Sequence, residues 1–509
     1  MSKLSNIKMP VNATEQDLLK KVSKMSNIPI NKIKHFKIIK KSLDARDKNN
    51  IFYNYSVEVS TKPICESEKV YKKVKSSPRV LVVGAGPAGL FCALTLLRSG
   101  AKLLLVERGK KVEDRQKSVD TFINSGILDE NSNIQFGEGG AGAFSDGKLN
   151  TQVGGEYVKL VLNEFVKFGA PSEIAYLNKP HIGSDNLPKV IKNIRNEILA
   201  LGGEIKFSTT LTDLEIASGK VKKAYFENHS EEFDEVVLAV GHSARDIYEM
   251  AKRRNIFIES KDFAVGLRIE HLKDDINLAQ YGEKYATLSC MPTADYKLTS
   301  NYNGRGVFTF CMCPGGFVMP SSSSENTVVV NGMSNYKRDN VNSNSALVVQ
   351  VSKKDFGEDV FGGVNFQIQM EQLAYNLGGG DYKAPYMLTG DYLKGSNSSS
   401  FGKVIPSYQM GVKKADLNLL FSTEINSAIK FAITDMGKRL KGFDSYDSIL
   451  TGVESRTSSP IKITRNSDLT SVSVSNLYPC GEGCGYAGGI TSASIDGIKV
   501  AEKIVEKYL

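Results

Sequence analysis

The chain has 509 residues, of which 41% are hydrophobic and 24% are charged. This composition is ordinary for a globular protein, but the length exceeds one compact core, so two or three domains are expected. No apolar stretch is long enough to span a bilayer, and the first residues resemble neither a secretory signal nor a transit peptide. These features exclude a membrane protein and predict a cytoplasmic one. The seven cysteines are scattered and odd in number, which argues against a disulfide framework.

The net charge of +9 is concentrated near the N-terminus. Residues 1–79 hold 18 Lys and Arg against 7 Asp and Glu, a balance of +11, so the remainder is slightly acidic. Lysine-rich surfaces attract polyanions, but a solvated charged face is the more common outcome of such a composition. We therefore predict no nucleic-acid partner and no membrane partner.

Residues 1–77 are predicted to form a small basic α+β domain. Thr14 followed by Asp17 has the spacing of a helix-start capping pair, and apolar residues follow at helical positions. Residues 35–46 and 51–61 have the composition of strands. The polar segment after them is a linker that ends near residue 77.

Residues 78–246 are predicted to form the first part of a Rossmann-type domain. An apolar strand leads into VLVVGAGPAGL, which contains a full dinucleotide fingerprint at Gly84, Gly86 and Gly89. The following helix offers its free N–H groups to a pyrophosphate. Glu107 ends the next strand, 23 positions after Gly84, where an acid takes the adenosine ribose hydroxyls.

A glycine-rich loop follows within the same part of the chain. Five glycines lie within residues 137–147, in the segment NIQFGEGGAGAFSDGKLNT, and such a loop can wrap a pyrophosphate. The strand VVLAVGHS resembles a third element of the glutathione-reductase-like flavoproteins, and this resemblance implies that the chain returns to the FAD-binding domain at Ala239–Gly241.

Residues 247–444 alternate strand-like segments with loops rich in Gly, Ser and Asn. We interpret this region as a mixed, β-rich substrate domain inserted into the nucleotide-binding fold. Residues 445–509 then supply the C-terminal part of that fold, with a strand, a glycine-rich turn and a long helix.

The C-terminal segment distinguishes FAD from NAD. NLYPCGEG, followed by AGGI and a helix, resembles the second FAD motif of the glutathione-reductase-like flavoproteins, although the usual Gly-Asp is Gly481-Glu482 here. The resemblance implies that Glu482 binds the ribityl hydroxyls and that the N–H groups of Gly489 and Ile490 face the flavin pyrimidine edge. The field of the helix N-terminus there favours anionic reduced flavin.

Together with GVESRTSSPIKITR, KPHIGSDNL and FCMCPGG, these motifs resemble a bacterial family of FAD-dependent dehydrogenases of unknown substrate. The resemblance covers nearly the whole chain. The sequence departs from the family pattern at Cys484, where a small residue such as Ala is expected. It implies FAD as the cofactor, and it predicts no metal. The candidate cofactor-binding residues are Gly84, Gly86, Ala88, Gly89, Glu107, Arg108, Gly139, Gly140, Gly142, Gly241, Gly481, Glu482, Gly489 and Ile490.

Two residues are candidates for the chemistry of the substrate. Arg456 could hold an anionic group in a bidentate grip, or it could pair with Glu454 or another acid and shape its loop. His181 could donate a proton or contact the substrate, and a hydrogen-bonded structural histidine is an equally good interpretation.

The cysteines admit two interpretations. Cys311 and Cys313 form a C-x-C, which is a poor zinc pattern without a second pair, and packing at a tight turn is favoured over a redox role. Packing is also favoured for Cys480 and Cys484.

The predicted function is hydride transfer between FAD and a polar, anionic small organic substrate. No second dinucleotide fingerprint follows Gly89, so NAD(P)H would dock only transiently or the substrate itself would supply the hydride. The alternatives are a flavin monooxygenase or oxidase, and a non-catalytic FAD protein that docks a partner through its basic N-terminal domain. The sequence leaves the oligomeric state open.

Overall fold

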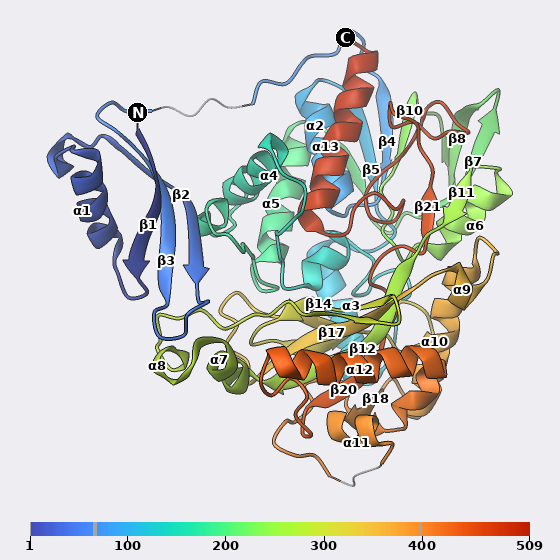
Figure 1. Cartoon of the computed structure of the whole chain (residues 1–509). Coiled ribbons are helices and arrows are strands. Elements are labelled where there is room, and N and C mark those ends of the chain that lie inside the picture. The colour runs from blue at the N-terminus through green and yellow to red at the C-terminus, as the bar shows by residue number, and fades with distance from the viewer. Residues whose placement is uncertain (1, 65–68, 397–399) are drawn as a thin grey trace.

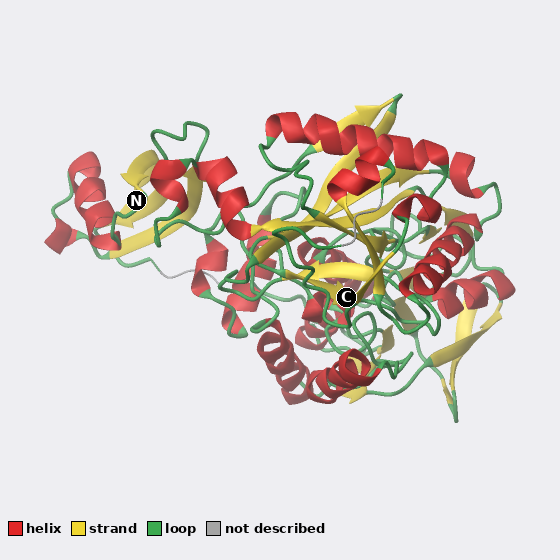
Figure 2. Cartoon of the chain, turned by 90° about the horizontal axis from the view of Figure 1, so that it is seen from below, coloured by secondary structure: helices red, strands yellow, loops and turns green. Residues whose placement is uncertain are grey.

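The chain folds into a small N-terminal domain and a larger body that contains two extended sheets (Figure 1). A computed structural model describes residues 2–64, 69–396 and 400–509. Seen from below, the N-terminal domain stands to one side of the body (Figure 2). Within the described residues, the structure contains no helix that is long and apolar enough to cross a membrane.

The N-terminal domain is the predicted α+β unit. Its antiparallel sheet has the order β1-β3-β2, and helix α1 packs Leu18 and Val22 against it. The Thr14 side chain and the Asp17 side chain bond each other's backbone N–H groups, which confirms the predicted capping box. The elements are β1 (Ser2–Pro10), α1 (Glu15–Ser26), η1 (Ile30–Lys32), β2 (His35–Asp44) and β3 (Phe52–Ser60).

A five-stranded parallel sheet forms the core of the predicted Rossmann-type domain. Its order is β22-β10-β4-β5-β6, and every neighbouring pair is parallel. Helices α2 and α13 lie side by side on one face (Figure 1). They approach so closely that a Cβ on Gly497 would lie 2.0 Å from the carbonyl oxygen of Ala88. The elements are β4 (Arg79–Val83), α2 (Pro87–Arg98), β5 (Lys102–Val106), β6 (Glu204–Lys206), β10 (Glu235–Leu238), β22 (Leu477–Pro479) and α13 (Ile490–Lys507).

Further elements extend this domain around the sheet. A three-stranded antiparallel meander, β7-β8-β9, lies between β6 and β10 in sequence, and β11 pairs with β21. The elements are α3 (Val112–Ser125), η2 (Gly140–Phe144), α4 (Glu156–Lys167), η3 (Ser172–Ala175), α5 (Leu187–Ala200), β7 (Leu211–Ala217), β8 (Lys220–Phe226), β9 (Ser230–Glu231), α6 (Arg245–Arg253), β11 (Ile258–Ser260) and β21 (Ile461–Ile463).

The inserted domain is built on a seven-stranded mixed sheet of order β13-β14-β17-β12-β20-β18-β19. Only β18 and β19 pair in parallel. Helix α12 covers one face, where Ile425, Ile429 and Ile433 join the main core of the domain. The strands are β12 (Phe263–Leu272), β13 (Thr299–Tyr302), β14 (Arg305–Cys313), β17 (Asn342–Val351), β18 (Ala384–Leu388), β19 (Val412–Lys414) and β20 (Ile449–Glu454).

The opposite face of this sheet is turned towards the Rossmann-type domain (Figure 1). The antiparallel β15-β16 pair packs against strands β12, β14, β17 and β20 of the sheet. The remaining elements of the inserted domain are α7 (Lys273–Tyr281), α8 (Glu283–Ala286), β15 (Phe317–Pro320), β16 (Val330–Met333), α9 (Lys353–Phe356), α10 (Gly362–Gly378), α11 (Thr389–Lys394), η4 (Leu417–Leu420) and α12 (Thr423–Arg439).

The chain crosses between the two domains several residues later than the sequence predicts. The expected start of the inserted domain at residue 247 falls inside helix α6, which spans Arg245–Arg253. The expected return at residue 445 precedes β20, which still pairs with β12 and β18 of the seven-stranded sheet. The first difference arises because α6 continues past residue 247, and the second because β20, which begins only at Ile449, completes the seven-stranded sheet from a distant part of the chain.

Candidate active site

A cavity of about 350 Å³ lies between the two domains. On the Rossmann side its wall includes Val83, Val106 and Ala239, which lie at or next to the carboxyl ends of β4, β5 and β10. On the other side it includes Phe310 and Asn331 of the inserted domain. In parallel α/β sheets, ligands bind at the carboxyl ends of the strands, so this cavity is where the fold places a cofactor.

The fingerprint turn forms one end of the cavity. Gly84 has φ +102°, and a Cβ there would lie 2.4 Å from the Ala239 carbonyl oxygen. A Cβ on Gly89 would lie 1.9 Å from the carbonyl oxygen of Gly84. Only glycine fits these two positions, and helix α2 begins directly after Gly86 without a side-chain cap. The N–H groups of the first turn are therefore left for an anion.

Glu107 holds three backbone segments together beside that turn. Its carboxylate accepts hydrogen bonds from the N–H groups of Ala85 at 2.8 Å, Gly109 at 2.9 Å and Gly137 at 3.0 Å. The residue also lines the cavity. The adjacent Arg108 pairs with Asp246 and lies over the ring of Phe136, so its guanidinium is fixed at the cavity wall.

The glycine-rich loop is organised by the buried guanidinium of Arg115. Arg115 donates to the carbonyl oxygens of Asn133, Ile134, Glu138 and Gly140. These oxygens are thereby engaged away from the cavity, and the loop can approach the fingerprint turn. A Cβ on Gly140 would lie 3.2 Å from the Cα of Gly86. Gly140 and Gly142 line the cavity, whereas the would-be Cβ of Gly139 meets the Ile191 side chain behind it.

Glu482 presents a carboxylate to the cavity from the C-terminal segment. In the described part of the chain, no hydrogen-bond donor reaches this carboxylate, and burial raises its pKa to about 7. Gly241, Gly488 and Gly489 also line the cavity, and an added Cβ on any of them would meet no protein atom within 4 Å. These three glycines leave space that a bound group can fill.

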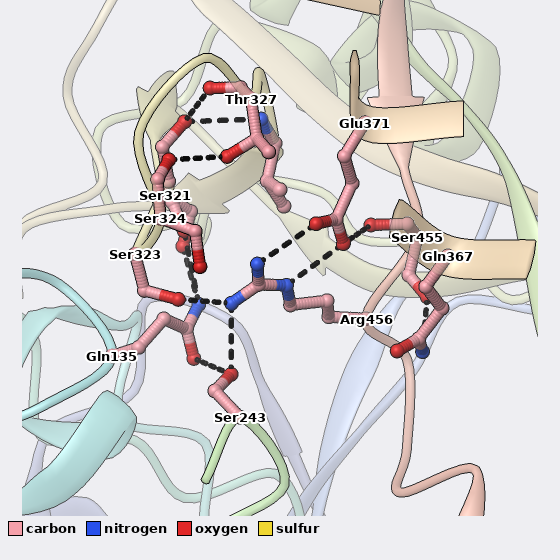
Figure 3. Close-up of polar contacts among 12 residues, drawn as sticks. Gln135, Ser243, Ser321, Ser323, Ser324, Thr327, Gln367, Glu371, Ser455 and Arg456 are labelled. Atoms are coloured by element: carbon pink, nitrogen blue, oxygen red, sulfur yellow. Dashed lines mark hydrogen bonds and ion pairs between the residues drawn. The ribbon is translucent and has the colours of Figure 1, made fainter. Parts of the chain in front are cut away.

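Arg456 reaches the cavity wall within a buried polar cluster (Figure 3). Its Nε and Nη2 each donate to the Glu371 carboxylate at 2.9 Å, and Nη1 donates to the hydroxyls of Ser243 and Ser323. Glu371 accepts further bonds from Arg245 and Ser455. The acid that pairs with Arg456 is thus Glu371.

Glu454, the acid adjacent to Arg456 in the sequence, has a different partner. It forms a buried ion pair with Arg268, whose Nε lies 2.9 Å from a carboxylate oxygen. Arg268 is fully buried and also donates to Asn344. The charges of Arg268 and Glu454 therefore compensate each other at the wall of the cavity.

His181 lies outside the cavity wall, with Nε2 3.0 Å from the carbonyl oxygen of Tyr336 and its ring stacked on the Tyr336 ring. Burial and the nearby Arg338 lower its pKa, so the ring is neutral at neutral pH. His242 does line the cavity, and burial with the neighbouring Arg456 lowers its pKa to about 4. Neither imidazole is a cation at neutral pH.

Cys480 and Cys484 are fully buried in separate apolar clusters. The Cys484 thiol donates to the carbonyl oxygen of Leu238, and burial raises the pKa of both thiols. Of the four cysteines considered from the sequence, Cys311 reaches the cavity.

Comparison with known proteins is consistent with this architecture. Residues 1–60 match a domain of unknown function, residues 78–265 match the pyridine nucleotide-disulphide oxidoreductase model, and residues 262–457 match the FAD-dependent protein C-terminal domain-like model. An uncharacterized protein of Clostridium beijerinckii is 44% identical over 531 aligned positions, which cover 99% of each chain. The chain belongs to this uncharacterised family of FAD-dependent oxidoreductases.

Other similarities of this FAD-dependent oxidoreductase are partial or remote. An NADH oxidase of Thermoanaerobacter brockii is 34% identical over 61 residues, which is 11% of this chain and 9% of that protein. The flavin-dependent halogenase CmlS matches with a TM-score of 0.38 and 12% identity, covering 85% of this chain and 59% of its own. The brominase Bmp2 matches with a TM-score of 0.36 and 11% identity, over 85% and 80% of the two chains.

The cavity residues fit FAD, the cofactor of this oxidoreductase. The fingerprint turn and the α2 N-terminus suit the pyrophosphate, and the unpartnered Glu482 carboxylate suits the ribityl hydroxyls. Helix α13 begins at Ile490, after Gly489, and also lacks a side-chain cap. Its free N–H groups and partial positive charge suit the flavin pyrimidine edge, where reduction of the flavin adds negative charge.

Several residues at the oxidoreductase cavity were not identified from the sequence. Arg268 is one of them: a cation in a buried, largely apolar strand indicates a buried ion partner. That pattern could have revealed its pairing with Glu454, which was considered only as a partner of Arg456. Glu371 had no such signal, because it lies in an ordinary helical segment 85 positions from Arg456. Lys148, which follows the glycine loop, was also missed.

Proposed function

We propose that this FAD-dependent oxidoreductase transfers a hydride between FAD and a small polar organic substrate that carries an anionic group, with NAD(P)H as a transient electron donor. The observation that carries the proposal is the charge of the Arg456 cluster at the cavity wall. Two guanidiniums, Arg245 and Arg456, share the single carboxylate of Glu371. The pKa of Glu371 is lowered by both arginines, so the carboxylate is ionised at neutral pH and the cluster keeps one positive charge in excess.

An uncompensated positive charge beside a partly enclosed cavity attracts an anion more strongly than the same charge in water. Arg456 is the cation of this cluster that lines the cavity, whereas Arg245 lies behind it. Substrate and flavin would then meet between the two domains, and the proposed role of Arg456 is to hold the anionic group. His181 forms an isolated antiparallel β-bridge with Lys148, which lines the cavity. We therefore propose His181 as a substrate contact only for a substrate that extends past Lys148.

A transient nicotinamide donor agrees with the single dinucleotide fingerprint of the chain. Separate Rossmann domains for FAD and NADPH would require a second one. The short similarity to an NADH oxidase also supports a nicotinamide as the electron donor.

The test compares Arg456→Ala with Arg245→Ala. Each variant leaves Glu371 with one guanidinium, and each breaks part of a buried ion pair, at a cost of about 3–5 kcal/mol of stability. Only Arg456→Ala removes the charge at the cavity wall. Flavin absorbance and the melting temperature show whether each variant folds and keeps FAD.

The half-reactions are then measured by anaerobic stopped-flow absorbance, first with NADH and NADPH, then with anionic and neutral oxidants. We expect Arg456→Ala to slow reoxidation by anionic substrates on the order of a hundredfold, because it removes the guanidinium at the cavity wall. Arg245→Ala should slow it less, because it cancels the excess charge of the cluster but leaves the Arg456 guanidinium in place. Wild-type rates in both variants would refute the anion site. Rapid oxygen consumption with a hydroxylated product would favour a monooxygenase instead.

A further inference from the structure

Strand β14 carries a bulge that brings Cys311 and Cys313 to the cavity side of the seven-stranded sheet. Its pairing with β17 shifts between Phe310 and Cys313, and Cys311 has φ +42°, which is unusual for a residue with a side chain. Before the bulge, Val307 points into the core under α12; after it, Met312 does so. The extra residue therefore turns Cys313 to the face that Cys311 already occupies.

The two cysteines differ in their exposure to the cavity. Cys311 is half-buried and lines the cavity, whereas Cys313 is completely buried behind it. The Cys313 thiol donates to the Cys311 carbonyl oxygen at 3.3 Å, so its sulfur is held against the backbone of Cys311. This arrangement gives one accessible sulfur and one sheltered sulfur within reach of it.

The surroundings of the pair are electropositive. Lys148, from the loop that follows the glycine cluster, donates to the Cys313 sulfur at 3.6 Å. Lys148 and Arg338 share the single carboxylate of Asp146, so one positive charge remains in excess there. Together with the thiol of Cys313, the charges of Lys148 and Arg268 lower the pKa of Cys311. An enclosed thiolate at Cys311 would balance the excess charge.

We propose that Cys311 and Cys313 form a redox-active dithiol at the flavin cavity, which reduces small disulfides. Cys311 is the attacking sulfur and Cys313 the resolving sulfur. The inference rests on the proposed function only for the supply of electrons, and it specifies a disulfide as the class of substrate that accepts them. The excess charge on the Arg456 cluster favours a disulfide that carries carboxylates.

The exchange balances as follows. The Cys311 thiolate attacks one sulfur of the disulfide RSSR, so that the S–S bond of RSSR breaks, a new S–S bond joins the Cys311 sulfur to one RS group, and the other leaves as RS⁻. The Cys313 sulfur then attacks the Cys311 sulfur, the mixed S–S bond breaks, and the second RS group leaves. This group takes the proton of Cys313, so the products are the Cys311–Cys313 disulfide, RS⁻ and RSH. Restoring thiolate and thiol takes two electrons and one proton, which reduced flavin supplies when it is bound.

Oxidised glutathione, an anionic disulfide, is the probe for the first test, and the readout is mass rather than activity. The purified holoenzyme is incubated with it anaerobically, its free thiols are alkylated, and it is digested with trypsin. Cleavage after Arg305 and Lys337 places both cysteines in one peptide, residues 306–337. We expect this peptide to resist alkylation and to be lighter than the dithiol form by two hydrogens.

The variants separate the two roles. Cys313→Ser should retain a covalent glutathione adduct at Cys311, because no second thiol resolves it, whereas Cys311→Ser should form neither adduct nor disulfide. Cys290→Ser, which removes an exposed cysteine outside the cavity, is the matched control and should behave as wild type. Complete alkylation of both cysteines in wild type, or no adduct in Cys313→Ser, would overturn the proposal.

Anaerobic reductive titration supplies a second readout. The disulfide form of the wild-type holoenzyme should take up about four electrons per chain, and each single cysteine variant about two. A long-wavelength absorbance band between the Cys311 thiolate and oxidised flavin should be absent from Cys311→Ser. If NADH and NADPH fail to reduce the flavin but the disulfide still forms, the proposed function fails and the dithiol stands. If the flavin is reduced and the pair stays inert to oxidised glutathione, the dithiol fails alone.

Discussion

At the scale of single residues, two carboxylates determine how the cavity receives FAD. Glu107 is engaged by three backbone N–H groups, which join the fingerprint turn to the glycine loop. Glu482 has no donor among the described residues and faces the cavity. One acid therefore shapes the site before the cofactor binds, and the other is left for the cofactor itself.

Glu107→Arg should strongly reduce FAD occupancy. The variant leaves three buried N–H groups without their acceptor, at a cost of about 1–3 kcal/mol each, and places a cation where ribose hydroxyls are expected. The ratio of flavin to protein absorbance after gel filtration measures the effect. Glu232→Arg, at an exposed position, is the control for charge reversal. Full FAD retention in Glu107→Arg would contradict the assigned role.

FAD should bind more tightly as the pH rises from 6 to 8. Burial raises the pKa of Glu482 to about 7 in the FAD-free fold, so the side chain must lose a proton to accept hydroxyl hydrogen bonds as a carboxylate. Binding then releases a proton, and the affinity increases by up to about tenfold over this range. Titration of the FAD-free protein by flavin fluorescence measures it. Glu482→Gln should lose the pH dependence, and an unchanged slope in that variant would show that another group titrates.

At the scale of elements, helix α13 places its N-terminus at the cavity through an uncrowded glycine turn. Gly489→Ala should fold normally, because the backbone there is extended at φ 172° and a Cβ meets no protein atom within 4 Å. The added methyl group would occupy cavity space, so FAD occupancy should fall at least tenfold. Gly154→Ala is the matched control, since its Cβ also meets nothing but lies outside the cavity. Equal flavin absorbance in the two variants would contradict the placement of the flavin.

Elements whose structure depends on local sequence were predictable, and those that depend on distant contacts were not. The turn at Gly84–Gly89 and the capped helix α1 follow from residues within a few positions of each other. The bulge at Cys311 has no such local cause, because a cysteine there adopts a positive φ only within the completed sheet. The Arg456–Glu371 pair likewise requires α10 to pack beside the loop after β20.

At the scale of the whole molecule, the N-terminal domain packs against the inserted domain through the loop between β2 and β3, where Ile51 is buried in the core of the inserted domain. At the edge of β2, the backbone N–H of Lys41 donates to the Tyr176 carbonyl oxygen, and the Lys41 carbonyl oxygen accepts from the N–H of Asn178. The Lys48 side chain donates to the Ala279 carbonyl oxygen. Val74 and Lys75 already bond the body at Ser99 and Tyr508. The domain lies apart from helices α2 and α13 (Figure 1).

Removal of residues 1–64 should therefore leave FAD bound. The absorbance spectrum of the truncated protein should match that of the full chain, with a loss of thermal stability because the truncation removes Ile51 from the core of the inserted domain. Despite its positive charge, we also expect the full chain to show no sequence-selective binding to labelled DNA or RNA at physiological salt, as measured by fluorescence anisotropy. Loss of flavin on truncation, or tight sequence-selective binding, would assign this domain a role that its position does not suggest.

The order of strands in the five-stranded sheet also has a consequence for biosynthesis. Strand β22, next to β10, and helix α13, against α2, come from the last part of the chain, and 398 positions separate Arg79 from Leu477. At translation rates of about 5–20 residues per second, roughly 20–80 s pass between the synthesis of β4 and the synthesis of β22. The apolar face of α2 is exposed on the nascent chain during that interval, and Glu482 is not yet made. FAD is therefore acquired only near the end of synthesis, and the nascent chain must avoid aggregation without help from its cofactor.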